Sequence, residues 1–517
     1  MITIFGTTAG KNLTHRAVQR VMRAPVSFFD TTPLGRIMNR FSKDVDVMDN
    51  NLTETMRMSL FSLTSMVSIF ALTIAYYYYF AAALVPLMII YLYSGAYYQA
   101  SAREVKRHEA VLRSSVFARF GEALSGTATV RAYGLQGQFL EKLNTAIDNM
   151  DSAYYLTFAN QRWLGVRLDA IGVSFLFVAG MLIVTNRFSI PPSIGGLVLS
   201  YLLSILMMLQ MVVRQVADVQ NNMNATERII YYGKKLEEEA PAHNPNTKIP
   251  EAWPQKGEIV FDDVKMRYRE KLPLVLHGIN LQVRPGERLG LVGRTGAGKS
   301  SIANALFRIV ELASGTISID GIDIKTVGLE DLRSRMAIIP QDPTLFQGTV
   351  RSNIDPFNKY TDLELWSALR QAHLVEAEDT TETSENRITL ETQVESEGTN
   401  LSLGQRQLMA LTRALVRGSK IIICDEATSS IDFETDRKIQ RTMVEGFRGK
   451  TLLCIAHRLR TIIEYDRVCV LDEGKVAEID TPLALFEKGG IFKGMCERSG
   501  ISREDILKAN QVMTGSG

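Results

Sequence analysis

The chain has 517 residues, of which 46% are hydrophobic and 22% are charged, and its 58 basic and 56 acidic side chains leave a net charge of +2. About 150 residues make one domain, so this length predicts two or three domains, and the composition excludes a disordered or collagen-like chain. Because so small a net charge provides no overall attraction for a polyanion, no nucleic-acid partner is expected.

The charged residues are distributed very unevenly along the chain. None occurs from Met58 to Ala102, and a second stretch, from Ala170 to Val213, contains only Arg187. One membrane span needs about 20 helical residues, so each stretch predicts two spans joined by a tight turn. The four spans are expected near residues 58–77, 79–100, 166–187 and 193–214. The alternative, buried helices of a large soluble core, does not account for uncharged runs of this length.

Basic residues flank the first pair of spans and indicate their orientation. Lys and Arg recur between Lys11 and Lys43 and again between Arg103 and Arg119, which predicts that both flanks lie in the cytosol. The long cytosolic connections have a helical pattern, so the spans are expected to continue well past the lipid. The apolar residues before Lys11 are expected to be the tail of a further helix. Residues 1–233 thus predict an all-α domain in the lipid bilayer.

A segment with two prolines, Pro25 to Arg36, interrupts the first cytosolic stretch and predicts a short turn with exposed Phe28 and Phe29. On these residues alone, a plain corner between helices and a docking element for a cytosolic domain are equally good interpretations. Residues 234–256 are polar and rich in proline, and they are expected to form a linker.

Residues 257–517 alternate short β-branched runs with helical segments, the pattern of an α/β domain with a largely parallel sheet. All four cysteines lie in this part without CxxC spacing, which predicts reduced cytosolic thiols rather than a disulfide framework or a zinc site.

A glycine-rich loop in this domain has the phosphate-loop pattern. It follows an apolar strand at residues 288–292 and precedes a helical segment at residues 302–309, the context that this motif requires. Its backbone NH groups can turn towards a phosphate chain, while Lys299 neutralises the β and γ phosphates and Ser300 coordinates Mg²⁺. ATP and Mg²⁺ are therefore the expected cofactors, and a plain glycine-rich turn is the weaker alternative. The expected nucleotide contacts here are Gly293, Arg294, Thr295, Gly296, Ala297, Gly298, Lys299, Ser300 and Ser301.

A second apolar run, residues 421–424, follows Lys420 and ends in two carboxylates. Asp425 is expected to hold the metal, and Glu426 to polarise a water for attack on the γ-phosphate. An apolar run that ends in Asp-Glu is usually an ordinary strand end. The phosphate loop upstream makes the catalytic interpretation the better one.

Between these motifs lies the sequence Leu401-Ser-Leu-Gly-Gln405, followed by a helical run over residues 408–416. Together the motifs resemble the nucleotide-binding domain of an ATP-binding cassette (ABC) transporter, in which the Ser-x-Gly-Gln signature separates this family from other phosphate-loop ATPases. The resemblance implies a P-loop cassette that works as a pair. The signature residues expected to reach the γ-phosphate of another cassette are Ser402, Leu403, Gly404 and Gln405.

Further positions match the family's motifs in order. Tyr268 resembles the aromatic residue that stacks on adenine, and Gln341 resembles the Q-loop residue, which implies a part in metal binding and in catalysis. Asp432 lies in a segment that resembles the D-loop, and His457 resembles the switch histidine of the catalytic site. Alone, Tyr268 or His457 would more often be a packing residue, but the series is specific.

Motifs in the membrane half extend the resemblance to the second half of the multidrug-resistance-associated (ABCC) subfamily. They are Pro25–Arg36, Asn39–Asp44 and Asn160–Arg167. The segments Ile491–Ile501 and Cys454–Leu459 are similar to fungal oligomycin-resistance transporters. The resemblance covers almost the whole chain, and it implies that the Pro25–Arg36 segment docks near the Q-loop of a cassette.

The chain departs from the family pattern in two ways. Leu403 stands where the common signature has a second glycine, so this chain is expected to supply the catalytic carboxylate of a competent site and a weakened signature to the other site. The chain has four spans and a stub where a second half of this subfamily is expected to have six membrane helices. It has one cassette where a full transporter has two. An N-terminal half with its own membrane domain and cassette is therefore the expected partner, and the chain is expected to be a C-terminal half or a truncated fragment.

Four side chains near the cytosolic ends of the last two spans are expected to contact substrate. They are Arg162, Trp163, Arg167 and Arg214. The guanidinium groups would attract anionic or amphipathic compounds, and the indole would offer a flat apolar surface. Anchoring of the spans at the membrane surface by snorkelling is an equally good interpretation.

The resemblance implies an exporter of the ABCC type that couples ATP hydrolysis to efflux of organic, xenobiotic or anionic compounds from the plasma membrane or the vacuolar membrane. Three alternatives remain: an ATP-gated channel or a regulatory subunit of the same subfamily, a soluble ABC ATPase that acts on nucleic acid, and a non-functional truncated fragment. The uncharged stretch from Met58 to Ala102 disfavours the soluble ATPase.

Overall fold

The computed structural model describes residues 2–185, 191–247, 249–375, 388–425, 433–456 and 459–514. The chain divides into two compact units. The helical unit comprises Met1–Arg23 and Thr32–Leu236, and the α/β unit comprises Ala24–Thr31 and Glu237–Gly517.

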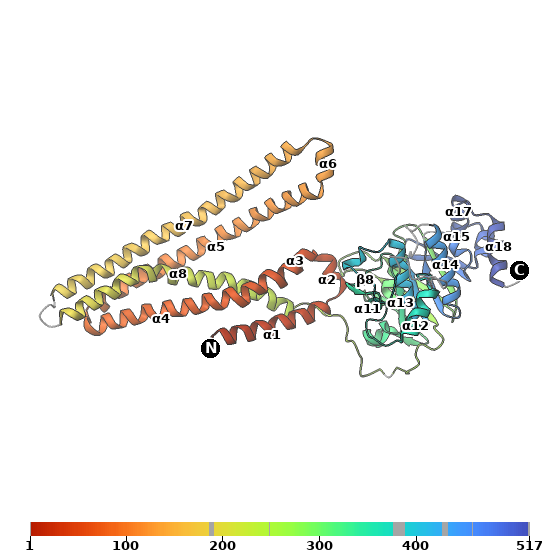
Figure 1. The fold of residues 1–517 in the computed structure, drawn as a ribbon, viewed down its shortest axis with the longest axis horizontal. Coiled ribbons are helices and arrows are strands. Elements are labelled where there is room, and N and C mark those ends of the chain that lie inside the picture. Colours follow the sequence, from red (N-terminus) through yellow and green to blue (C-terminus); the bar gives the residue numbers. More distant parts are fainter. Residues whose placement is uncertain are drawn as a thin grey trace. The chain divides into compact units, whose positions relative to one another are not determined.

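The described part of the helical unit consists of long helices connected by short segments (Figure 1). The elements are α1 (Ile2–Met22), α3 (Leu34–Asn39), the π-helical turns η1 (Arg40–Asp44) and η2 (Val47–Leu52), α4 (Thr53–Tyr76), α5 (Phe80–Ser125), α6 (Thr127–Ala132), α7 (Gln136–Thr185) and α8 (Pro192–Lys234). Four helical stretches are long and apolar enough to cross a membrane: Leu34–Tyr76, Phe80–Ser125, Gln136–Thr185 and Pro192–Lys234.

The helix ends follow from the local sequence. α4 ends at Tyr76, because Tyr77 leaves the helical region with φ −126° and ψ 75°, and α5 begins at Phe80. The predicted turn between the first two spans therefore lies within the run of tyrosines. α5 has 46 residues and α7 has 50, which at a rise of 1.5 Å corresponds to about 69 and about 75 Å. These helices are more than twice as long as the bilayer core is thick, which is about 30 Å.

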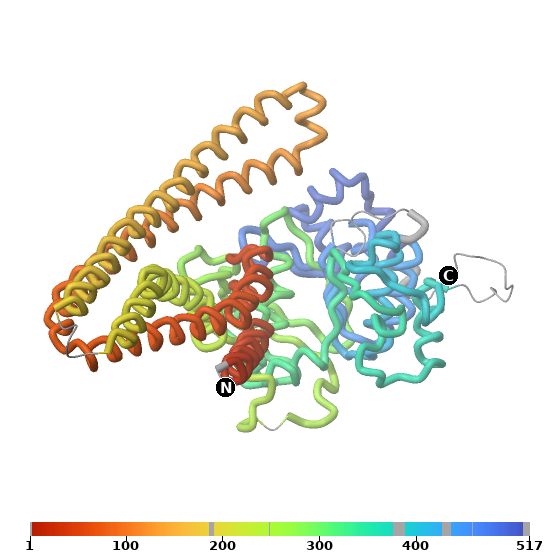
Figure 2. The backbone as a smooth tube through the Cα atoms, turned by 60° about the vertical axis from the view of Figure 1, so that its left-hand side comes forward, coloured from red at the N-terminus to blue at the C-terminus, as the bar shows by residue number. Residues whose placement is uncertain are grey.

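The helical unit packs through one apolar cluster and exposes many other apolar side chains. Phe175 of α7 lies against Phe70 of α4 with ring centroids 5.2 Å apart, and Leu168 and Ile205 are completely buried. By contrast, Phe61 is 65% exposed, as are many large apolar side chains of the four long stretches. Lipid, rather than water, suits such a surface. α5 and α7 run side by side and are joined through α6 (Figures 1 and 2).

The Pro25–Arg36 segment is helical rather than a simple turn, so that expectation was wrong. It contains α2 (Val26–Thr31) and the start of α3, and the rings of Phe28 and Phe29 meet edge to face at 5.3 Å. Proline fits immediately before a helix because the first helical NH groups have no partner within the helix. Pro25 and Pro33 both stand at such positions.

Two sheets form the centre of the α/β unit. The larger has the order β12-β11-β3-β10-β9-β6, and its strands are parallel except for β12 at one edge. The smaller, antiparallel sheet has the order β2-β1-β4-β5, and β7 pairs with β8. The strands are β1 (Ile259–Met266), β2 (Leu276–Val283), β3 (Arg288–Gly293), β4 (Ser314–Ile319), β5 (Ile322–Asp323), β6 (Met336–Ile339), β7 (Gly348–Thr349), β8 (Gln393–Val394), β9 (Ile421–Asp425), β10 (Thr451–Ile455), β11 (Arg467–Asp472) and β12 (Lys475–Asp480).

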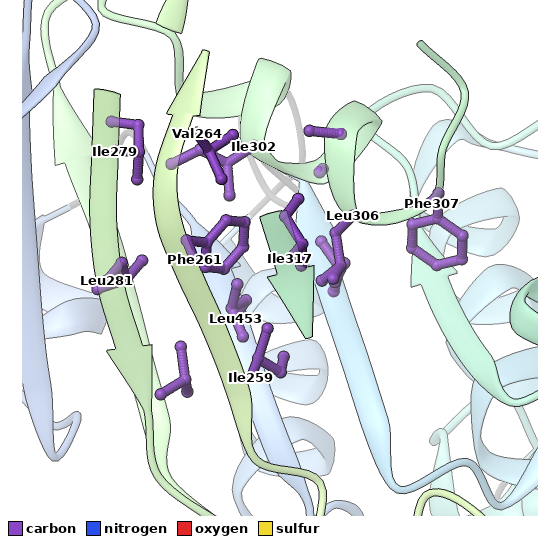
Figure 3. Close-up of a cluster of buried hydrophobic side chains, with 14 of the residues drawn as sticks. Ile259, Phe261, Val264, Ile279, Leu281, Ile302, Leu306, Phe307, Ile317 and Leu453 are labelled. Atoms are coloured by element: carbon purple, nitrogen blue, oxygen red, sulfur yellow. The ribbon is translucent and has the colours of Figure 1, made fainter. Parts of the chain in front are cut away.

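Helices cover these sheets, and the predicted α/β class is confirmed. The helical elements are α9 (Lys299–Leu306), η3 (Ile324–Thr326), α10 (Leu329–Arg333), α11 (Val350–Ile354), α12 (Asp362–Gln371), η4 (Ser396–Gly398), α13 (Leu403–Arg417), α14 (Phe433–Gly446), α15 (Leu459–Ile462), α16 (Pro482–Lys488), α17 (Ile491–Arg498) and α18 (Arg503–Thr514). Phe261 of β1, Ile302 of α9 and Leu453 of β10 belong to one buried cluster between the two sheets (Figure 3).

The four cysteines of the α/β unit are buried and unbridged. Burial raises the pKa of the Cys454 thiol to about 11 and that of Cys469 to about 12. A thiol with so high a pKa stays protonated at neutral pH, as expected for reduced, inert cysteines.

The segment predicted as a linker is bound to the α/β unit along most of its length. Arg333 of α10 forms a two-pronged ion pair with Glu239 at 2.8 and 2.9 Å, and the NH group of Glu330 donates to the carbonyl of Ala242 at 3.0 Å. Further along, the indole NH of Trp253 donates to the carbonyl of Ile319 at 3.0 Å. A composition rich in proline thus marks a segment whose described residues from 235 to 256 form no helix or strand, although the segment is not loose.

Candidate nucleotide-binding site

The phosphate loop lies between β3 and α9, where two glycines are required by the backbone. Gly293 has φ +154°, and a Cβ atom there would lie 2.3 Å from the carbonyl oxygen of Leu471. Gly298 has φ +96° and caps the N-terminus of α9. α9 begins at Lys299, three residues before the predicted start at Ile302, because the left-handed Gly298 ends the loop immediately before it. The first NH groups of an α-helix have no partner within the helix, and such a helix end suits a phosphate.

Lys299 is the cation of the loop. Its side chain is buried, and its ammonium group donates to the carbonyl oxygens of Gly293 at 2.8 Å and Arg294 at 3.2 Å. These bonds hold the ammonium over the loop, where it can meet the phosphates of a nucleotide.

Ser300 and Asp425 bring the two predicted metal ligands together. The hydroxyl of Ser300, in the first turn of α9, donates to a carboxylate oxygen of Asp425 at 3.2 Å, and Asp425 is the last residue of β9. The carboxyl ends of parallel strands meet at one edge of a sheet, which explains how residues 125 positions apart become neighbours. A hydroxyl beside a carboxylate at a phosphate cradle fits a hard cation such as Mg²⁺.

Tyr268 follows β1 and lies beside α9. Its hydroxyl is 3.0 Å from the hydroxyl of Ser301 and accepts a bond from the side-chain amide of Asn304 at 3.3 Å. The ring is half-buried and packs against the core of the α/β unit. Contact of this ring with adenine stays a prediction.

The signature residues form the N-terminus of α13. The Ser402 hydroxyl accepts from the NH of Gln405 at 3.2 Å, and the Gln405 side chain accepts from the NH of Ser402 at 2.9 Å, which makes a capping box. The helix therefore begins at Leu403, five residues before the predicted start. Leu403 is half-buried and Gly404 is buried.

Gln341 lies two residues beyond β6, and its side chain is exposed. Its carbonyl oxygen accepts a hydrogen bond from the side-chain amide of Gln407 on α13. Gln407 belongs to no sequence motif that predicts this contact, because its partner is a backbone atom 66 positions away. Glu426, Asp432 and His457 lie outside the described residues, so their predicted roles rest on the sequence.

The predicted substrate residues lie in the helical unit. The guanidinium of Arg167 stacks over the Trp163 ring at 3.9 Å, and the ring of Tyr97 lies 5.2 Å from the same indole. Part of the flat surface predicted for substrate is therefore covered by this chain's own side chains. Arg162 is exposed.

Arg214 connects to a polar network that the sequence did not reveal. It donates to the side-chain oxygen of Gln210 at 2.9 Å, and the amide of Gln210 donates to Asp169 at 2.5 Å. Gln210 and Arg214 are four residues apart on α8, so their spacing could have suggested a pair. The link to Asp169 on α7 depends on the packing of the two helices.

Each of the two units matches a known protein family. The family described as ABC transporter transmembrane region matches residues 1–211, and the family described as ABC transporter matches residues 276–429. Together with the four candidate spans, the first match identifies a multi-pass membrane protein.

Several transporters are similar to nearly the whole chain. The ABC-type transporter cicA of Emericella nidulans is 62% identical over 97% of this chain and 37% of its own length. The oligomycin resistance ATP-dependent permease YOR1 of Saccharomyces cerevisiae is 46% identical over 98% of this chain and 35% of its own length. The ATP-binding cassette sub-family C member 3 of Mus musculus is 43% identical over 96% of this chain and 32% of its own length. The chain thus spans about a third of the length of these relatives. The chain belongs to the ABC transporter family, with a transmembrane region followed by an ATP-binding cassette of the kind found in sub-family C.

Proposed function

We propose that this chain is the C-terminal half of an ATP-driven exporter, and that its α/β unit binds and hydrolyses ATP together with the cassette of an N-terminal half. The observation that carries the proposal is the phosphate cradle, in which Lys299, Ser300 and Asp425 converge at the carboxyl edge of the parallel sheet. The similarity to membrane transporters over nearly the whole chain supports the coupling of that site to transport.

Each residue of the site has a distinct task. Lys299 and the NH groups at the start of α9 neutralise and orient the phosphates. Ser300, Asp425 and Gln341 would hold Mg²⁺, which when bound would neutralise charge on the phosphates. Glu426 is proposed to orient and polarise the attacking water, and His457 to act as the switch histidine of the catalytic site.

The signature of α13 serves the other cassette's nucleotide. Leu403 carries a side chain where a glycine would let the backbone approach the phosphates, so the site to which it contributes is expected to be the weaker of the two. The site built on Glu426 is expected to be the competent one.

The transported compounds are proposed to be organic and at least partly apolar, with anionic compounds included. The exposed guanidinium groups of Arg162 and Arg214 support this class. The yeast relative is an oligomycin resistance permease, which makes oligomycin the first compound to test. The Pro25–Arg36 helices are proposed to dock on a cassette and so to transmit its closure to the spans.

Hydrolysis by the assembled transporter tests the proposal. The chain is expressed with the N-terminal half of cicA, and phosphate release is measured for the unmodified pair, for Lys299→Ala and for Glu426→Gln. Lys299→Ala is expected to abolish ATP binding, whereas Glu426→Gln is expected to keep binding and to slow turnover about a hundredfold or more.

Lys325→Ala, a change of an exposed lysine in the same unit, serves as the matched control and is expected to leave the rate unchanged. Unaltered turnover in Glu426→Gln would show that the catalytic carboxylate lies elsewhere.

A further inference from the structure

The segment between β6 and β7 pairs with no strand, and several of its backbone carbonyls accept hydrogen bonds from side chains of other elements. The amide nitrogen of Gln407 donates to the carbonyl of Gln341 and lies 3.4 Å from that of Pro340. Arg413 donates to the carbonyls of Thr344 at 2.9 Å and Asn353 at 2.6 Å. Two side chains of α13 therefore hold the segment that carries the predicted Q-loop glutamine.

Gln407 donates to this segment, but its own side-chain oxygen accepts no hydrogen bond from the described residues. Its side chain is 2% exposed, and its Oε1 atom has no hydrogen-bond partner among the described residues. A buried acceptor without a partner is unfavourable for folding. Methionine would fill the same space without an unpaired oxygen, so packing alone does not account for a glutamine at this position.

Gln407 lies on α13 between the signature at the start of the helix and the backbone of Gln341. Ser402 caps the helix at the signature, and Gln407 lies five residues further on, which is about 7.5 Å along the axis. A displacement of the signature end therefore displaces the Gln407 amide and, through it, the backbone of Gln341.

We propose that Gln407 is a positioning residue that holds Gln341 for metal-dependent ATP binding and connects the signature end of α13 to that site. The inference rests on the proposed function, because it assigns a task within the same nucleotide site. Gln407 itself touches neither nucleotide nor metal in this account.

Binding of a fluorescent ATP analogue to the detergent-solubilised full chain tests the proposal. Affinity is measured with Mg²⁺ and again with a chelator, for the unmodified chain and for Gln407→Met. Loss of one hydrogen bond to a carbonyl is expected to weaken binding about three- to tenfold in Mg²⁺. Binding in the chelator is expected to be unchanged, because Lys299 and the phosphate loop do not depend on Gln341.

Gln440→Met on α14 is the matched control, since it removes a half-buried helical glutamine whose amide bonds only weakly to Asp436 at 3.4 Å. Should Gln407→Met fail to fold, Gln407→Asn keeps the amide but is one methylene too short to reach Gln341. It is expected to show the same metal-specific loss.

Equal affinity in Mg²⁺ for variant and unmodified chain would overturn the inference. So would an equal loss with and without Mg²⁺ together with a lower unfolding temperature, since that pattern indicates a purely structural role. An unmodified chain that binds no ATP under either condition would instead refute the proposed function, and this inference with it.

Discussion

Tyr268 combines two contributions that substitution can separate. Its hydroxyl bonds to α9, at Ser301 and Asn304, while its ring is the proposed contact for adenine. Tyr268→Phe keeps the ring and loses the hydroxyl, so it is expected to lower the free energy of unfolding by about 1 kcal/mol and to leave ATP affinity nearly unchanged.

Tyr268→Ala is expected to weaken ATP binding about tenfold, because stacking on a base is lost with the ring. Thermal unfolding and binding of a fluorescent ATP analogue measure the two effects. If the phenylalanine variant binds ATP as poorly as the alanine variant, the hydroxyl rather than the ring is the functional group.

At the scale of elements, one ion pair connects the π-helical turn η1 to α8. Arg228 donates to both carboxylate oxygens of Asp44, at 2.6 and 2.8 Å, and Arg40 donates to the same group at 2.8 Å. Burial opposes ionisation of Asp44, but the two guanidinium groups outweigh it and lower its pKa below the ordinary value of 3.8. Asp44→Asn is expected to reduce the free energy of unfolding by about 1–3 kcal/mol at neutral pH.

The pH dependence of this effect has a definite sign. A carboxyl group with a depressed pKa in the folded state stabilises the fold fully above its unfolded value, here 3.8, and loses that contribution as the pH falls through the folded value. The difference between Asp44→Asn and the unmodified chain should therefore be constant above about pH 5 and shrink below about pH 4. Circular dichroism in detergent follows the unfolding.

Glu54→Gln, which breaks an exposed pair with Arg57 on α4, is the control and should have a smaller effect than Asp44→Asn. A difference between Asp44→Asn and the unmodified chain that persists undiminished to pH 3 would contradict the ion-pair account.

The segment predicted as a linker also contacts the start of α10 at Gly328, and one added methyl group can disturb this contact. A Cβ atom at Gly328 would lie 2.3 Å from the carbonyl oxygen of Ala242 and 2.6 Å from the Cα of His243. Gly328→Ala is therefore expected to push residues 241–244 off α10 and to make them accessible to protease. Limited proteolysis followed by mass spectrometry detects the cut.

Gly494→Ala is the control, because a Cβ atom there meets nothing within 4 Å and alanine favours the helix α17. Equal cleavage rates in the two variants would show that the segment is not held in the way described.

The elements that one strong sequence signal marks were predictable from the sequence. Absence of charge from Met58 to Ala102 predicted two long helices, and the phosphate-loop pattern predicted strand, loop and helix in the right order. Features that depend on hydrogen bonds or ion pairs between residues far apart in the sequence were not predictable. The linker segment is attached by the ion pair of Arg333 with Glu239, 94 positions away. The backbone of Gln341 is held by a hydrogen bond from the Gln407 side chain. Such side-chain pairings leave no local pattern.

At the scale of the whole molecule, the chain brings together spans and a cassette but covers about a third of the length of its relatives. The phosphate loop precedes α9 and the signature begins α13, and the family resemblance implies that each completes a site with another cassette. Transport is therefore expected to require this chain and an N-terminal half together.

ATP-dependent uptake into inside-out membrane vesicles measures whether transport needs ATP and both halves. Vesicles that contain the chain with the N-terminal half of cicA are given an organic dye or labelled oligomycin, with and without ATP. Accumulation is expected only with ATP, only with both halves present, and not with Lys299→Ala. Uptake that proceeds equally without ATP or with Lys299→Ala, or an ATP-dependent ionic current without accumulation, would contradict the account.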